Sequence, residues 1–266
     1  MKLGGATAVA AALSTIAAPA FADAPGPICA DRPGKANPTC IVPPGMVQVE
    51  TALADWARDR SGGVASDEIA IGGTAVKFGL TDRLHIELDV APYISVRGRS
   101  GGAVERVSGF GDSGVALKYR LTEGTAPVQV ALYPFVKIPT AGHSLGNGKV
   151  EGGVAVLADA TIPGTAISVN IAPQIDLVAD GDGSGYHLGM VQVASVGVPL
   201  SSRFSVSGEL WAAWDFDPAE TVRQYSLDGA AAYLIGTDVQ LDGGVNLGLN
   251  RATPDVEIYA GIAVRF

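Results

Sequence analysis

Histidines are the side chains of this sequence best suited to acid–base or metal chemistry, and there are three: His85, His143 and His187. They lie on separate segments, and none has a Cys, His or Asp partner at the spacing of a metal-ligand motif. His143 is followed by Ser144, but no group that would orient a nucleophilic serine can be recognised beside it. We therefore expect polar structural roles for the histidines, and a protein that is not an enzyme and has no catalytic residues, metal or cofactor.

An acidic, glycine-rich run, Asp180–Gly185, resembles the opening of a calcium-binding loop. The twelfth position of such a loop holds a bidentate Glu, whereas this sequence has Val191 there. The run is therefore expected to be a flexible outer loop.

The first residues indicate the compartment. Lys2 gives a short positive region, and residues 6–18 are apolar or small. Pro19 and the run Ala20-Phe21-Ala22 then complete an A-x-A cleavage pattern. This layout predicts a signal peptide over residues 1–22, cleaved before Asp23. A membrane-anchoring helix is the weaker alternative, because the apolar run is too short to span a bilayer.

Cys29 and Cys40 are the only cysteines, and they lie in a segment rich in Pro, Gly and polar residues. Two cysteines close together in an exported chain usually form a disulfide. We expect the bridge to close one small loop in a periplasmic segment over residues 23–45. A pair of free thiols is the alternative.

The composition is apolar, but the sequence lacks long apolar runs. Hydrophobic residues make up 47% of the chain and charged residues 17%, and the mean hydropathy is +0.28. No stretch after the signal approaches the roughly 20 apolar residues of a spanning helix, so the hydrophobicity must be distributed by alternation. The net charge of −9 disfavours a nucleic-acid partner, because phosphate binding needs Lys and Arg.

Alternation is explicit in the last segment of the chain. One face is apolar and holds Val256, Ile258, Ala260, Ile262, Val264 and Phe266. The other face holds Glu257, Tyr259, Gly261, Ala263 and Arg265. A two-residue period that lasts about ten residues is long for a globular strand and suits a tilted membrane strand.

Twelve segments of this kind can be recognised. They lie near residues 46–57, 68–80, 83–95, 110–121, 126–138, 150–161, 165–178, 186–199, 202–215, 222–235, 238–249 and 255–266. Short turns alternate with longer loops, which lie near residues 58–67, 96–109, 139–149, 179–185, 216–221 and 250–254. This alternation is typical of outer-membrane barrels, whose closure leaves no unpaired edge in lipid. We predict an all-β fold: a transmembrane, antiparallel, up-and-down β-barrel of 12 strands over residues 46–266.

The C-terminus gives a more specific signal. The chain ends in Phe266, with Val264 on the same face and Gly261 five residues before the end. This ending resembles the β-signal that the barrel-assembly machinery reads, so we expect that machinery and outer-membrane lipid as partners. A soluble β-sandwich also shows alternation, but the strand length, the loop pattern and the terminal Phe favour the barrel.

A family resemblance rests on the run Asp31–Cys40, on Pro43-Pro44-Gly45, and on the opening strand Val47–Thr51 with Asp55-Trp56. These residues resemble a family of exported outer-membrane transporters of the phenol-degradation meta-pathway type. Membership would imply an outer-membrane barrel linked to the uptake of small aromatic or hydrophobic compounds. The resemblance over the rest of the mature chain is one of pattern, and it implies no binding residues.

Inward-facing polar and aromatic side chains are the candidates for function. The expected lumen-lining residues are Glu87, Asp89, Tyr93, Lys118, Arg120, Tyr133, Phe135, Lys137, Asp159, Asp176, Glu209, Trp211, Asp228 and Asp242. Acids of the third strand are expected to face bases of the fourth and fifth. A barrel of this size lies between filled eight-stranded and open sixteen-stranded barrels. We therefore expect a channel for small, hydrophobic or aromatic solutes. The alternative is a closed structural or surface-interaction barrel without transport.

Overall fold

The computed structural model describes residues 26–61 and 63–266, so the expected signal peptide lies outside the described residues. This part of the chain folds into strands and contains no helix that could cross a membrane. The sixteen strands are β1 (Val47–Ser61), β2 (Val64–Ile71), β3 (Thr74–Thr81), β4 (Leu84–Val90), β5 (Tyr93–Ser100), β6 (Ala103–Gly109), β7 (Ser113–Arg120), β8 (Val128–Ile138), β9 (Glu151–Thr161), β10 (Ser168–Ile171), β11 (Gln174–Ala179), β12 (Tyr186–Pro199), β13 (Phe204–Phe216), β14 (Thr221–Ile235), β15 (Val239–Gly248) and β16 (Val256–Arg265).

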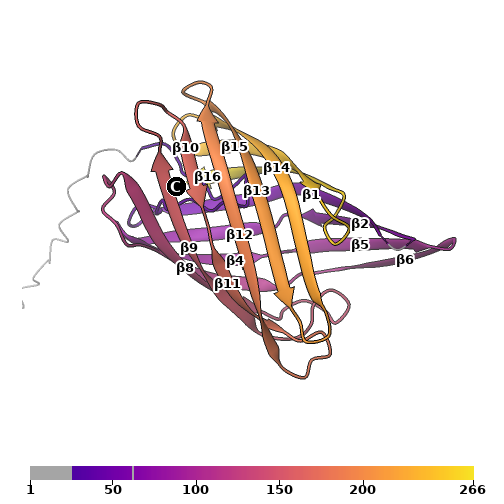
Figure 1. Cartoon of the computed structure of the whole chain (residues 1–266). Coiled ribbons are helices and arrows are strands. Elements are labelled where there is room, and N and C mark those ends of the chain that lie inside the picture. Colours follow the sequence, from indigo (N-terminus) through magenta and orange to yellow (C-terminus); the bar gives the residue numbers. More distant parts are fainter. Residues whose placement is uncertain (1–25, 62) are drawn as a thin grey trace, which may run out of the picture.

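The strands form one antiparallel sheet that closes on itself (Figure 1). Closure occurs where β16, already paired with β15, also pairs with β1. We call each crossing of the barrel wall by the chain a pass. Four passes are interrupted once each, so that β2 continues as β3, β4 as β5, β6 as β7, and β10 as β11. The sixteen strands therefore make twelve passes, and the predicted twelve-stranded barrel is confirmed.

Side chains alternate between an apolar outer face and a polar interior. On β4, the outward Leu88 is 51% exposed, whereas the inward His85 and Glu87 are only 1% and 4% exposed. The same division recurs on β15, where Leu247 is exposed and Asn246 is buried. Soluble proteins show the opposite distribution. An apolar surface around a polar interior is suited to lipid outside the barrel and polar groups within it.

Interruptions in three neighbouring passes lie side by side. They are at Gly72-Gly73, at Ala91-Pro92 and at residues 110–112. Pro92 has no N–H for the ladder, and Gly72 has a positive φ that other residues rarely adopt. The interrupted passes remain connected, because the Gly111 N–H donates to the Ala91 carbonyl at 2.8 Å. Beyond this line, the end of β1 projects with β2, β5 and β6 as an extension of the sheet (Figure 1).

This extension corrects two of the expected loops. Where loops were expected at residues 58–67 and 96–109, β1 pairs with β2 as far as Ser61 and Val64, and β5 pairs with β6 as far as Ser100 and Ala103. Almost the whole of β6 is exposed. Since no face of β6 is buried, the alternation that marks a membrane strand is missing from its sequence.

The remaining connections differ in length between the two ends of the barrel. Connections at residues 139–150, 180–185 and 249–255, and a shorter one at 217–220, lie at the end that carries the extension, where loops were expected. The opposite end has the tightest turns, at residues 82–83 and 236–238, besides connections at 121–127, 162–167 and 200–203. In outer-membrane barrels the short turns face the periplasm, so we name the two ends extracellular and periplasmic.

Arginine substitutions on β13 test the orientation of the wall. Leu210 is 60% exposed at the middle of the strand, and Ser207 on the same strand lines an internal cavity described below. Leu210→Arg should lower the free energy of unfolding in lipid vesicles by about 2–4 kcal/mol. Ser207→Arg should lower it much less, because its side chain enters a cavity that is shielded from lipid and contains hydroxyl groups. Denaturant titration in vesicles measures both values, and equal losses would contradict the assigned faces.

Candidate functional site

The N-terminal residues 26–42, which we call the lumen segment, lie inside the barrel. Ile28 and Val42 are 5% and 3% exposed. The Ile28 N–H donates to the Thr237 carbonyl at 2.7 Å, and the Val42 N–H donates to Nδ1 of the inward His85 at 3.1 Å. The sequence predicted a periplasmic position for this segment. Its contacts with the barrel interior could not be foreseen, because a segment without periodicity does not reveal its partners. The expected disulfide between Cys29 and Cys40 is present and closes a loop within this segment.

Asp31 is the central anchor of the lumen segment. Its two carboxylate oxygens lie 2.5 Å from Nζ of Lys118 and 2.6 Å from Nζ of Lys77. Both lysine side chains are at most 1% exposed. Burial by itself would raise the pKa of Asp31, but the two ammonium groups outweigh burial and hold that pKa below its usual value. Asp31 therefore stays ionised and neutralises charge inside the lumen.

Glu50 of β1 completes this cluster. Its carboxylate pairs with the Lys77 ammonium and also accepts the backbone N–H groups of Asp31 and Arg32 at 3.0–3.1 Å. Lys118 gains two further acceptors from the lumen segment, Oδ1 of Asn37 at 2.6 Å and the Pro38 carbonyl at 3.0 Å. The segment and the wall therefore supply one another with partners for the Lys77 and Lys118 ammonium groups and the Glu50 carboxylate.

Arg32 extends from the lumen segment to β15 and β16, which lie next to β1 in the wall. Its guanidinium lies 3.1 Å from the carboxylate of Asp242 on β15, and over the ring of Tyr259 on β16 at 5.8 Å. Gly261 lies beneath it, where any Cβ would overlap the guanidinium. Gly261 was expected to belong to the assembly signal. Its position shows a further reason for a glycine, namely room for Arg32.

Lys35 makes a third set of contacts with the wall. Its ammonium lies 3.1 Å from the Asp228 carboxylate and 4.5 Å from the centre of the Trp211 ring. Its N–H donates to the Glu209 carboxylate at 2.8 Å. That approach needs Gly34, because a Cβ there would overlap the Glu209 carboxylate. Three of the expected lumen-lining residues, Glu209 and Trp211 of β13 and Asp228 of β14, therefore contact Lys35.

Other candidates have separate positions. Asp159 accepts the Thr39 N–H at 2.5 Å, and Tyr133 lies 5.5 Å from the Lys118 ammonium. Asp176 accepts a hydrogen bond from the side-chain amide of Gln174. The ring centres of Phe135 and Tyr133 are 6.2 Å apart. The rest lie further apart: Asp89 lines the cavity on the extracellular side, Arg120 bonds the Asp82 carbonyl in a periplasmic turn, and Tyr93 lies in the extension.

The expected pairing of third-strand acids with fourth- and fifth-strand bases is wrong. Lys118 binds Asp31 instead of Glu87, and Lys137 pairs with Asp112 and Glu151 near the extracellular end. Glu87 has only a distant ion pair, at 3.9 Å from Lys77. Sequence reasoning missed the charges of the lumen segment, Asp31, Arg32 and Lys35. The available signal was their concentration between the two cysteines.

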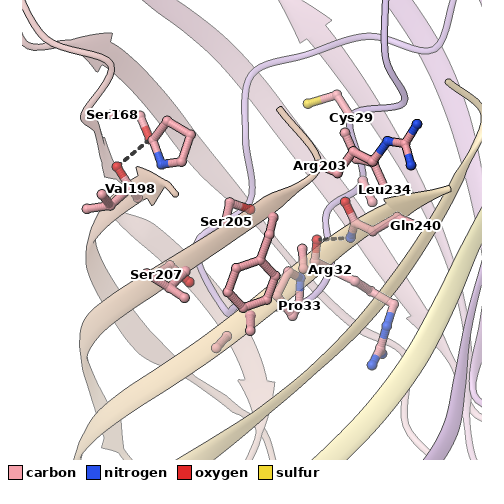
Figure 2. Close-up of a pocket in the computed structure, with 18 of the residues that line it drawn as sticks. Cys29, Arg32, Pro33, Ser168, Val198, Arg203, Ser205, Ser207, Leu234 and Gln240 are labelled. Atoms are coloured by element: carbon pink, nitrogen blue, oxygen red, sulfur yellow. Dashed lines mark hydrogen bonds between the residues drawn. The ribbon is translucent and has the colours of Figure 1, made fainter. Parts of the chain in front are cut away.

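Two cavities lie on the two sides of the lumen segment. One, of about 460 Å³, lies towards the periplasmic end between the segment and β12–β14. The other, of about 410 Å³, is bounded by the acids and lysines around Asp31. Arg32 and Pro33 line both. Figure 2 shows the first cavity, with Cys29, Arg32 and Pro33 of the segment and Ser168, Ser205 and Ser207 of the wall around it.

Removal of the central anchor should destabilise the protein. Asp31→Ala leaves Lys118 without a carboxylate partner, and loss of one partner of a buried pair costs about 3–5 kcal/mol. Denaturant unfolding in detergent measures the change. The control is Arg83→Ala at the exposed Arg83–Glu123 pair, which should leave stability nearly unchanged. An unchanged free energy of unfolding for Asp31→Ala would mean that the segment is not held by this anchor.

Solved structures share this fold. The COG4313 outer membrane channel from Pseudomonas putida F1 is 15% identical, with a TM-score of 0.65 over 88% of this chain and 99% of that one. The translocator domain of the autotransporter NalP from Neisseria meningitidis is 10% identical, with a TM-score of 0.53 over 84% of this chain and 88% of that one. At such identities the likeness shows the barrel fold alone.

Sequence comparison is more specific. No curated protein matches the chain. The model of a family described as "Putative MetA-pathway of phenol degradation" matches residues 30–266, which include most of the lumen segment and the entire barrel. The chain therefore belongs to this family, as the resemblance of the Asp31–Cys40 run and the opening strand indicated.

Proposed function

We propose that the protein is an outer-membrane channel for small amphipathic molecules, with the lumen segment as its constriction. It reaches the outer membrane through a signal peptide over residues 1–22 and through recognition of Gly261, Val264 and Phe266 by the barrel-assembly machinery. Phe266 supports the second step: it is 70% exposed, and its backbone pairs with Val47 at the closure of the barrel.

The observation that carries the proposal is the pair of cavities that share Arg32 and Pro33 as a boundary. Each has a volume in the range of small-molecule sites, roughly 300–1,000 Å³. They lie on the two sides of the lumen segment, which is held by polar contacts, and Arg32 and Pro33 line both. In the proposed channel, a displacement of the Arg32 side chain would widen the connection between them.

The lining of the periplasmic-side cavity favours a solute that is partly apolar. Ala230, Ala231 and Leu234 contribute apolar surface, whereas Ser205 and Ser207 contribute hydroxyl groups. Arg32 and Arg203 add positive charge. A small aromatic ring with one oxygen substituent would find partners for both of its parts, in agreement with the description of the family.

A closed barrel without transport is the alternative, and the ion pairs of Asp31 and Lys35 favour it. These pairs hold the segment across the lumen at several points. Channel and closed barrel differ in whether ions cross a membrane that contains the purified protein.

Single-channel recording in planar bilayers should show small, discrete conductance steps for the wild type. Arg32→Ala removes the side chain shared by both cavities and should raise the conductance several-fold. Arg83→Ala, in an exposed periplasmic turn, is the matched control and should conduct like the wild type. Heat-modifiable gel migration establishes that each variant is folded. If neither the wild type nor a folded variant without residues 26–41 shows conductance steps, the channel proposal is overturned and the protein is a closed barrel.

Aromatic solutes should interrupt the current. Phenol added to the bath should cause brief reductions of the open-channel current, because a ring that occupies either cavity excludes ions. Glycerol at equal concentration is the control, since it offers hydroxyl groups without a ring. Equal interruption by both compounds, in a protein that does conduct, would refute the aromatic preference and leave channel function intact.

A further inference from the structure

A histidine at the extracellular end of the barrel is surrounded by carboxylates. The His187 side chain is 6% exposed, and its Nδ1 lies 2.9 Å from Oδ1 of Asp180 and 3.9 Å from Oδ2 of Asp217. These three atoms lie within 4.8 Å of one another. The other ring nitrogen, Nε2, is hydrogen-bonded to Asp215. None of these contacts belongs to the constriction described above.

Three separate parts of the chain form this group. Asp180 follows β11, His187 lies at the start of β12, and Asp217 follows β13. The pairing of β12 with β13, which sets Gly189 opposite Asp215, brings Asp217 near His187. Asp217 is held in place because its carboxylate accepts the N–H groups of Gly181 and Ala219, each at 2.7 Å.

Charge in this cluster is unbalanced. Three carboxylates surround one imidazole, which carries at most a single positive charge. Within the described residues, no Lys or Arg forms an ion pair with Asp180, Asp215 or Asp217. A neutral imidazole can donate from only one nitrogen. If Nε2 donates to Asp215, then Nδ1 presents a lone pair towards the space between Asp180 and Asp217.

We propose that Nδ1 of His187 and the carboxylates of Asp180 and Asp217 bind a divalent transition metal of the Zn²⁺ type. Imidazole nitrogen and carboxylate oxygen are both zinc ligands, and zinc sites with three protein ligands keep a fourth position for water. Asp215 would then be an outer partner, since ligating histidines usually donate their second N–H to a carboxylate or carbonyl. The bound cation would also offset the excess negative charge.

The nature of the donors favours zinc over calcium. Calcium takes six to eight oxygen ligands, whereas this set has three protein donors, one of which is an imidazole nitrogen. In the sequence, the Asp180–Gly185 run resembles the opening of a calcium loop whose last ligand is missing. The structure assigns Asp180 to a different set, with partners from β12 and from the loop after β13.

Calorimetry with ZnCl₂ tests the proposal on the purified, detergent-solubilised protein after chelator treatment and dialysis, at neutral pH. The wild type should bind one zinc ion per chain in a saturable manner. His187→Gln should lose this binding. Asp215→Asn should weaken it by roughly 10–100-fold, as loss of an outer partner usually does.

Two matched controls separate this cluster from other surface groups. His143→Gln removes another loop histidine, and Asp182→Asn removes an acid of the same loop that is outside the proposed ligand set; both should bind zinc like the wild type. Heat-modifiable migration checks the fold of each variant. No saturable binding by the wild type would overturn the proposal and leave His187 as an ion-paired imidazolium. Retained binding in folded His187→Gln would overturn it as well.

Discussion

Two ammonium groups, on Lys77 and Lys118, lie inside the barrel almost without contact with water. A charge withdrawn from water needs opposite charges and hydrogen-bond acceptors around it. The wall supplies Glu50 to Lys77, and the lumen segment supplies Asp31 to both lysines. The path of the segment through the barrel follows from this requirement, and so does the division of the interior into two cavities.

The wall meets a second constraint, that of backbone pairing in lipid. The passes are interrupted only where bonds bridge the interruption: beside Gly72-Gly73, the Ala52 N–H donates to Gly73 at 2.7 Å and its carbonyl accepts from Gly72 at 2.8 Å. The edge of β6 that has no paired strand lies in the extension, and Glu105 and Arg106 there are the charged residues typical of protected edges. The sheet can therefore close into a barrel although four of its passes are interrupted.

Much of the wall could be predicted from sequence because each lipid-facing strand repeats the same two-residue period, as in Val256–Phe266. The extension could not, since β6 buries neither face. The partners of Lys118 were missed because they lie in a segment without any period. The surroundings of His187 were missed because Asp217 is distant in sequence, and only the pairing of β12 with β13 brings it near.

The close fit between segment and wall has a consequence for sequence divergence. Gly34 leaves space for Glu209, and Gly261 leaves space for Arg32, which in turn neutralises Asp242. A side chain gained at either glycine, or a charge lost at Asp31, would leave a partner displaced or unpaired on another strand. Related sequences should therefore change at these positions in pairs, so that the N-terminal segment and the barrel interior evolve as one unit while the lipid-facing residues vary independently.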